Sequence, residues 1–240
     1  MNFSSASFML AICCCGASFG VKPAWERQHN CKIIQRVLGV SRPQYWFSQL
    51  VFDLVVYFIF GAAVLVVVYA LPARTLFVYP DAILGLSLVI LASGPAVIQL
   101  SYIFEGLFKS DFLCFGSLFA SRAFVGIVFL EVGVSLTVLE SRGHGAAAAA
   151  NDILRWVLPL LPEYSVARTF YDIVDSNFKG TQLSLRENQG QALLFFVFFS
   201  VANSVLYSAI FWLIEAEVFQ WIFIRAAPTS AAVAPVSNKI

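Results

Sequence analysis

The sequence predicts an all-α membrane protein with about five transmembrane helices. Its mean hydropathy is +0.81, and 60% of its 240 residues are hydrophobic whereas 12% are charged. The charges are confined to short stretches between long apolar runs, a pattern typical of helical membrane proteins that cross the bilayer several times. The net charge of +1 provides no electrostatic basis for binding nucleic acid.

Five apolar segments are long enough to cross a hydrocarbon core of about 30 Å at about 1.5 Å per residue. The first is the richest in Ser and Cys, and it contains Gly16 and Gly20 at a spacing that lets another helix approach closely. The predicted spans are residues 3–21, 45–71, 82–104, 112–139 and 192–213.

A sixth apolar stretch, residues 152–174, is interrupted by Pro159 and Pro162. Proline removes a backbone hydrogen bond and bends a helix, so a straight span is not expected. The stretch also contains charged residues, Arg168 among them. It therefore predicts a broken, re-entrant helical hairpin that dips into one side of the bilayer and is surrounded by protein.

The loop after the first span carries five Lys and Arg residues and one Glu, whereas the other loops show no such excess. The positive-inside rule predicts that this loop is cytoplasmic. The hairpin and the N-terminus then lie outside, and an outside N-terminus without basic residues suggests that a span is missing before it. We expect an integral, multi-pass protein of the plasma membrane or an intracellular vesicle membrane.

The basic loop has the periodicity of a short amphipathic helix over residues 25–39, with Gly39 as its stop. One interpretation is an anchor that contacts acidic lipid head groups; the other is a docking element for a cytoplasmic partner. The polar side chains on one face are Gln28, His29, Lys32, Gln35 and Arg36, and the apolar face has Cys31, Ile33, Ile34, Val37 and Leu38.

Asp53, Arg122 and Glu131 are charged residues within predicted spans. A charge at mid-bilayer costs about 2.5–3.5 kcal/mol, so each should have a partner or face water. Asp53 and Arg122 lie about 8 and 10 residues from the cytoplasmic ends of their spans, which places them at similar depth at about 1.5 Å per residue. We therefore predict an Asp53–Arg122 ion pair, whereas Glu131 has no assigned partner.

Neither a metal site nor a catalytic site is predicted. Cys13, Cys14 and Cys15 point in three directions on a helix and cannot face one metal, and His29 and His144 have no cluster of ligands nearby. The phosphate-binding motif GxxxxGK[ST] does not occur. We expect a protein that is not an enzyme and has no cofactor of its own.

Two blocks of residues share the order and spacing of a known family, with weaker matches between them. The first block is Glu26, Arg27, Lys32, Gln35, Gly39, Val40, Tyr45, Trp46, Ser48, Asp53 and Tyr57; the second is Asn151, Asp152, Ile153, Leu154, Pro162, Arg168 and Asp172. The series resembles the second transmembrane half of ABC transporters of subfamily A, the large lipid exporters, over roughly residues 10–225.

This resemblance implies a fold like that of the type-II ABC exporters, with residues 1–225 as a partial transmembrane domain. Residues 25–39 become a coupling helix that touches a nucleotide-binding domain, and residues 152–174 become the exofacial hairpin before the last span. The implied coupling residues are Glu26, Arg27, Lys32, Gln35 and Arg36, and the implied hairpin residues are Pro159, Pro162, Arg168 and Asp172.

The sequence also departs from the family pattern. The first span, the exofacial domain and the nucleotide-binding domain are missing, and Asn30 and Ala167 replace a Lys and a Gly. Residues 226–240 are rich in Pro, Ala and Ser and predict a disordered cytoplasmic tail.

Two functions follow. The first is the transmembrane part of an ATP-driven ABC transporter that moves lipids, with ATP and Mg bound by a nucleotide-binding domain outside this chain. Its partners are then membrane lipids, that domain and the other transmembrane half. The alternative is a truncated or relic membrane protein that acts as a non-transporting scaffold for another transporter subunit.

Overall fold

The computed structural model describes residues 3–70, 80–178 and 188–215, and these residues are α-helical apart from short turns and one 3-10 turn. The predicted tail, residues 226–240, lies outside the described residues. In chain order the elements are α1 (Phe3–Ser18), α2 (Val21–Gln28), α3 (Cys31–Val37), α4 (Arg42–Ala70), α5 (Pro80–Glu105), α6 (Asp111–Ser141), α7 (Gly145–Val157), η2 (Leu158–Leu160), α8 (Pro162–Phe178) and α9 (Asn188–Glu215).

Five helical segments in the described residues are long and apolar enough to cross a membrane, which confirms the five predicted spans. The first continues through α2, because only a short turn at Phe19–Gly20 separates α1 from α2. It therefore ends later than the predicted limit at residue 21. The segments are Ser7–Gln28, Arg42–Val67, Ile83–Glu105, Asp111–Ser141 and Leu194–Glu215.

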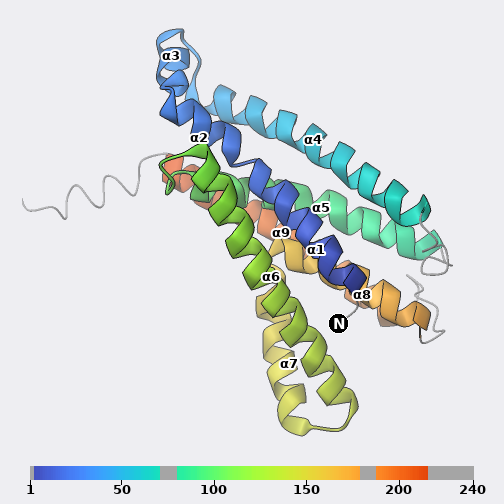
Figure 1. Cartoon of the computed structure of the whole chain (residues 1–240). Coiled ribbons are helices and arrows are strands. Elements are labelled where there is room, and N and C mark those ends of the chain that lie inside the picture. Colours follow the sequence, from blue (N-terminus) through green and yellow to red (C-terminus); the bar gives the residue numbers. More distant parts are fainter. Residues whose placement is uncertain (1–2, 71–79, 179–187, 216–240) are drawn as a thin grey trace, which may run out of the picture.

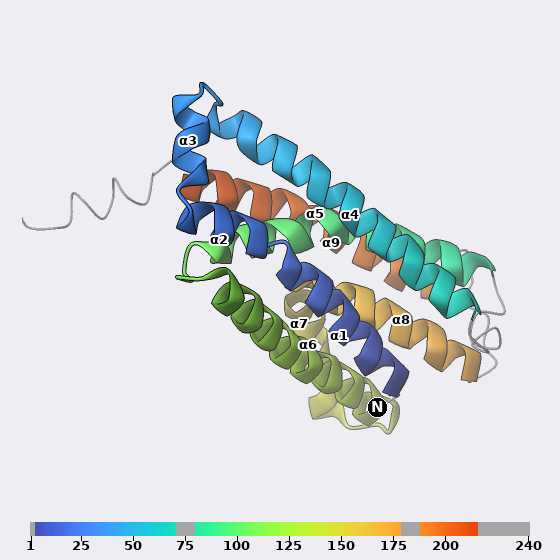
Figure 2. The same cartoon turned by 45° about the horizontal axis from the view of Figure 1, so that its top comes forward.

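The first and third of these segments form the centre of the bundle. In each of them 61% of the apolar window is buried, whereas 17% is buried in α4 and 22% in α6 and α9. α5 packs against α9, α4 and α8, and α1 lies between α4 and α6 (Figures 1 and 2). The outer helices therefore expose most of their apolar side chains, as expected of helices that face lipid.

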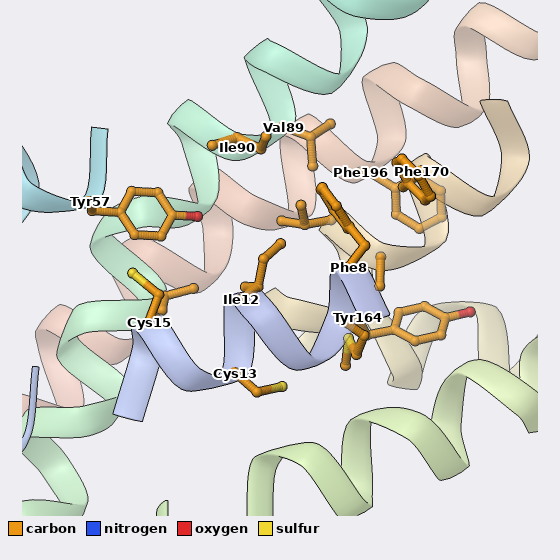
Figure 3. Close-up of a cluster of buried hydrophobic side chains, with 14 of the residues drawn as sticks. Phe8, Ile12, Cys13, Cys15, Tyr57, Val89, Ile90, Tyr164, Phe170 and Phe196 are labelled. Carbon is orange, nitrogen blue, oxygen red and sulfur yellow. The ribbon is translucent and has the colours of Figure 1, made fainter. Parts of the chain in front are cut away.

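The apolar core lies where α1 meets α5, α8 and α9. Figure 3 shows Phe8 and Ile12 of α1 among Val89 of α5, Phe170 of α8 and Phe196 of α9. The rings of Phe8 and Phe170 are stacked with their centroids 4.4 Å apart. α8 is therefore held inside the bundle by the same side chains that hold α1.

The helix of residues 152–174 is interrupted at Pro159 and Pro162, as predicted. Pro159 lies in the 3-10 turn η2 and Pro162 is the first residue of α8, where a missing N–H leaves no hydrogen bond unmade. The side chain of Asn203 donates to the Pro159 carbonyl at 2.6 Å, and the Tyr207 hydroxyl donates to the Leu160 carbonyl at 2.6 Å. α9 thus satisfies the backbone that the prolines leave open.

A buried ion pair joins the tip of this broken segment to α6. Nη1 of Arg122 lies 2.8 Å from Oε1 of Glu163, and the two side chains are 5% and 2% exposed. Nη2 of Arg122 also donates to the Val97 carbonyl of α5 at 3.1 Å. A Cβ on Gly16 of α1 would lie 2.2 Å from Nη1 of Arg122, so a larger residue there would displace the guanidinium from this position.

The structure does not bring Asp53 and Arg122 together, and this corrects the predicted pair. Asp53 instead accepts hydrogen bonds from Gln49 at 2.9 Å and from the Tyr102 hydroxyl. α1 lies between α4, which carries Asp53, and α6, which carries Arg122 (Figure 2). Similar depth in the membrane was therefore insufficient to predict an ion pair, because α4 and α6 are not neighbours.

We predict that Arg122→Gln and Glu163→Gln each destabilise the protein by about 3–5 kcal/mol, because each leaves a buried charge without its partner. The double variant should be less destabilised than the sum of the two single variants. Thermal unfolding of the purified protein in detergent measures these effects. Arg142→Gln, on the exposed turn between α6 and α7, serves as the matched control, and strictly additive losses would contradict the pairing.

Candidate functional site

The predicted amphipathic helix is two short helices, α2 and α3, rather than one. Asn30 lies between them with a φ of 56°, a left-handed conformation that Asn adopts more readily than most residues. The continuous helix expected over residues 25–39 is therefore interrupted. α3 ends at Val37 before Gly39, whose φ of 91° fits the predicted stop.

Glu105, the last residue of α5, gathers two of the predicted site residues. Nη1 of Arg27 lies 2.7 Å from one carboxylate oxygen, and Nζ of Lys32 lies 3.0 Å from the other. The Glu105 side chain is only 8% exposed. Arg27 also donates to the backbone carbonyl of Phe108. Because this pair of salt bridges is partly buried, solvent screens it less than an exposed pair.

Glu105 was not predicted from the sequence as a partner of the basic stretch. Its position at the end of the third span was the available signal, because that end lies on the same side of the membrane as the basic loop. We refer to this side as the basic end: it comprises α2, α3, the start of α4, the end of α5 and the start of α6.

Aromatic side chains extend the contacts of Lys32 to three spans. Nζ of Lys32 lies 4.3 Å from the centroid of the Trp46 ring in α4. The Trp46 ring lies 5.1 Å from that of Tyr102 in α5 and 4.8 Å from that of Phe211 in α9. A cation over an indole ring contributes about 0.5–2 kcal/mol, so α3 is attached to α4, α5 and α9 through one side chain.

The other predicted coupling residues lie around the same point. Glu26 is buried and accepts a hydrogen bond from the Tyr45 hydroxyl. Gln35 lines a cavity of about 490 Å³ between α3, α4, α5 and α9, which Arg27, Lys32 and Glu105 also line. Arg36 belongs to α3.

Three apolar side chains on α3 and directly after it point away from the bundle. Ile34, Val37 and Leu38 are 56%, 82% and 77% exposed. The polar face, through Lys32, instead turns toward Glu105. The basic end thus presents an apolar surface, and the opposite side of α3 is fixed to the bundle by the Lys32–Glu105 salt bridge. Such an exposed apolar surface is suited to binding another protein.

The predicted hairpin residues lie elsewhere. Arg168 and Asp172 pair one helical turn apart on α8, with Nε 3.0 Å from Oδ1. Nη2 of Arg168 also donates to the Thr137 hydroxyl of α6 at 3.1 Å. These residues line a second cavity of about 200 Å³, to which Pro159 also contributes, whereas Pro162 starts α8. The structure therefore places the predicted coupling residues at the basic end and the predicted hairpin residues in a separate group around the second cavity.

Across the described residues, no three His, Cys, Asp or Glu side chains are arranged to hold a metal ion. All five cysteines are free thiols. The basic-end group and the hairpin group both contain charged contacts between helices and exposed apolar surface. These features suit the binding of another molecule and the relative movement of helices.

The sequence of this chain is similar to those of known transporter proteins. Residues 2–224 match the family described as ABC-2 family transporter protein. The chain is 24% identical over 173 residues to the retinal-specific phospholipid-transporting ATPase ABCA4 of Homo sapiens and to that of Mus musculus, and 25% identical over 172 residues to ATP-binding cassette sub-family A member 17 of Rattus norvegicus. Each match covers 72% of this chain but only 7% of the ABCA4 proteins and 9% of the rat protein.

Replacing Glu105 with Gln should loosen the basic end, because Arg27 and Lys32 both lose their carboxylate. We expect faster amide hydrogen exchange across α2 and α3, with the rest of the bundle unchanged. Glu140→Gln, near the far end of α6, is the matched control. Unchanged exchange in α2 and α3 of the Glu105 variant would show that this carboxylate does not hold them.

Proposed function

The chain belongs to the ABC-2 family of transporter proteins, and from this membership we propose that it forms the transmembrane part of an ATP-driven transporter that moves lipids. The matched region is a membrane domain and not an ATPase domain. Domains of this kind work together with nucleotide-binding domains, which bind ATP and Mg. We propose that such a domain lies outside residues 1–240 or on a partner.

The observation that carries this proposal is the outward apolar face of α3, backed by the salt bridges to Glu105. The excess of basic residues argues that this end is cytoplasmic, and nucleotide-binding domains are cytoplasmic. We propose that α2 and α3 form the coupling element and that Val37 and Leu38 dock against the nucleotide-binding domain. Residues Arg27 and Lys32 would then transmit its movements to α5 and α4.

The broken segment of α7, η2 and α8 supports a re-entrant hairpin. α7 starts beside the end of α6, α8 leads on toward α9, and the break between them lies against the middle of α9 through Asn203 and Tyr207. α8 contacts α1, α5 and α9, and η2 contacts α9. Protein therefore covers the irregular backbone at the break, as needed at membrane depth, whereas α7 packs mainly on α6. We propose that it enters from the side opposite the basic end.

Lipid as the transported substrate rests on two arguments. The relatives from human and mouse are named phospholipid-transporting ATPases, although their match to this chain is distant. The outward faces of α4, α6 and α9 are also apolar and aromatic, so a lipid would meet compatible surface. The other transmembrane half of such a transporter would complete the path.

We predict that Leu38→Asp slows transport by about tenfold or more, because an unpaired carboxylate at an apolar interface costs more than the 1.4 kcal/mol that a factor of ten represents. The assay places the full chain and the ATP-binding polypeptide of the same transporter in vesicles, and follows movement of a fluorescent phospholipid with ATP. Leu139→Asp, near the opposite end of the bundle, is the matched control.

Two results would contradict the proposal. Equal rates for the Leu38 and Leu139 variants would exclude α3 as the docking surface. Absence of any ATP-linked lipid movement, with no binding of the ATP-binding polypeptide, would favour the non-transporting scaffold instead.

A further inference from the structure

The cavity of about 200 Å³ beside the hairpin has a composition that the coupling function does not explain. Four elements enclose it: α6, the α7–η2 segment, α8 and α9. Its lining residues are Thr137, Asn151, Arg155, Leu158, Pro159, Tyr164, Arg168, Asp172, Phe195 and Phe196. Leu158 and Pro159 are buried and form its apolar end, whereas Arg155 and Thr137 are exposed. Tyr164 is buried as well, and the Arg168 side chain is 12% exposed. The cavity thus combines apolar, hydroxyl and charged groups, and Arg155 lies on its exposed side.

The charges in this lining do not balance. Two guanidinium groups, Arg155 and Arg168, face one carboxylate, Asp172. Asp172 already pairs with Arg168, and among the residues that the structure describes Arg155 has no carboxylate partner; its guanidinium lies 5.3 Å from the centroid of the Phe195 ring. The cavity therefore favours a ligand group with one negative charge.

Both guanidinium groups have contacts in the wall of the cavity before any ligand arrives. Arg168 is fixed through Asp172 and the Thr137 hydroxyl, and Arg155 is held over Phe195. A planar guanidinium suits the oxygens of a phosphate, and a fixed one loses little side-chain entropy on binding. Asn151, which lines the cavity, donates its amide to Glu140 at 2.6 Å, and Glu140 itself does not line the cavity.

The size of the cavity restricts the ligand. Pockets that enclose a drug-sized molecule are about 300–1,000 Å³, so this one admits a head group and not a whole lipid. Acyl chains have a surface beside it, because Phe195 contacts Trp156 with ring centroids 5.4 Å apart and Trp156 is 61% exposed. Ile153, on the same helix, is also exposed.

We propose that this cavity is a phospholipid site: Arg155 and Arg168 bind the phosphate of a lipid in the leaflet opposite the basic end, and its acyl chains lie along Trp156 and Ile153. The proposal rests on the proposed entry of the hairpin into the membrane from that side. It places a bound lipid at the contact of the hairpin with α6 and α9, apart from the docking surface on α3.

The test is binding of a soluble short-chain lipid to the full chain after removal of endogenous lipid in detergent. Native mass spectrometry follows a one-to-one adduct with dihexanoylphosphatidylcholine. Arg155→Gln should weaken binding by about tenfold or more, because a hydrogen bond to a charged group is lost, and Arg168→Gln should do the same. Arg142→Gln, outside the cavity, should bind like the unchanged protein.

Two competitors identify the ligand. Dihexanoylglycerol has the same chains without phosphate and should not displace the lipid; equal binding of it would overturn the assignment of the phosphate. Inorganic phosphate should displace the lipid only weakly; displacement at equal concentration would identify a free-anion site and overturn the lipid proposal. Full binding by Arg155→Gln would overturn the proposal as well.

These results can be separated from failure of folding and from failure of the transport function. Arg155 is exposed on α7, so its variant should elute from size-exclusion chromatography like the unchanged protein even where Arg168→Gln does not. The assay contains neither ATP nor a nucleotide-binding domain. Loss of lipid binding therefore leaves the coupling proposal intact, and loss of ATP-linked transport leaves this one intact.

Discussion

The buried ion pair between Arg122 and Glu163 is the constraint on which the rest of the bundle depends. Neither charge is stable at this depth alone, so α6 and α8 must meet at this point. Glu163 lies in the first turn of α8, and the pair therefore fixes how far the broken segment reaches into the bundle. Gly16 leaves the space that Arg122 occupies, and this also fixes the position of α1.

The features that depend on neighbouring residues in the chain could be predicted from the sequence. Length and hydropathy were sufficient for the five spans, because each needs only about 20 apolar residues in succession. Pro159 and Pro162 were sufficient to locate a break, since their effect on the backbone is local. Gly39 indicated the end of α3 for the same reason. The left-handed residue at Asn30 was not predicted, because asparagine tolerates this conformation without requiring it.

The partners of the charged side chains could not be predicted, because they depend on which helices are neighbours. Similar depth in the membrane suggested that Asp53 pairs with Arg122. The arrangement of the helices in the bundle instead pairs Arg122 with Glu163, and Asp53 accepts hydrogen bonds from Gln49 and Tyr102. The sequence predicted an amphipathic stretch here, but the pattern did not imply the direction of its faces. Lys32 turns inward because Glu105 and Trp46 offer it a carboxylate and an aromatic face.

One face of α5 connects the basic end with the buried ion pair in the interior of the bundle. The Val97 carbonyl accepts from Arg122, the Ser101 hydroxyl donates to the Gly16 carbonyl at 2.6 Å, and Glu105 binds Arg27. These three positions are four residues apart, so they lie on the same side of the helix over about 12 Å. α5 is also among the most buried of the spans. A displacement of α2 and α3 that acts on Glu105 is therefore applied to the same helix face that positions the hairpin through Arg122.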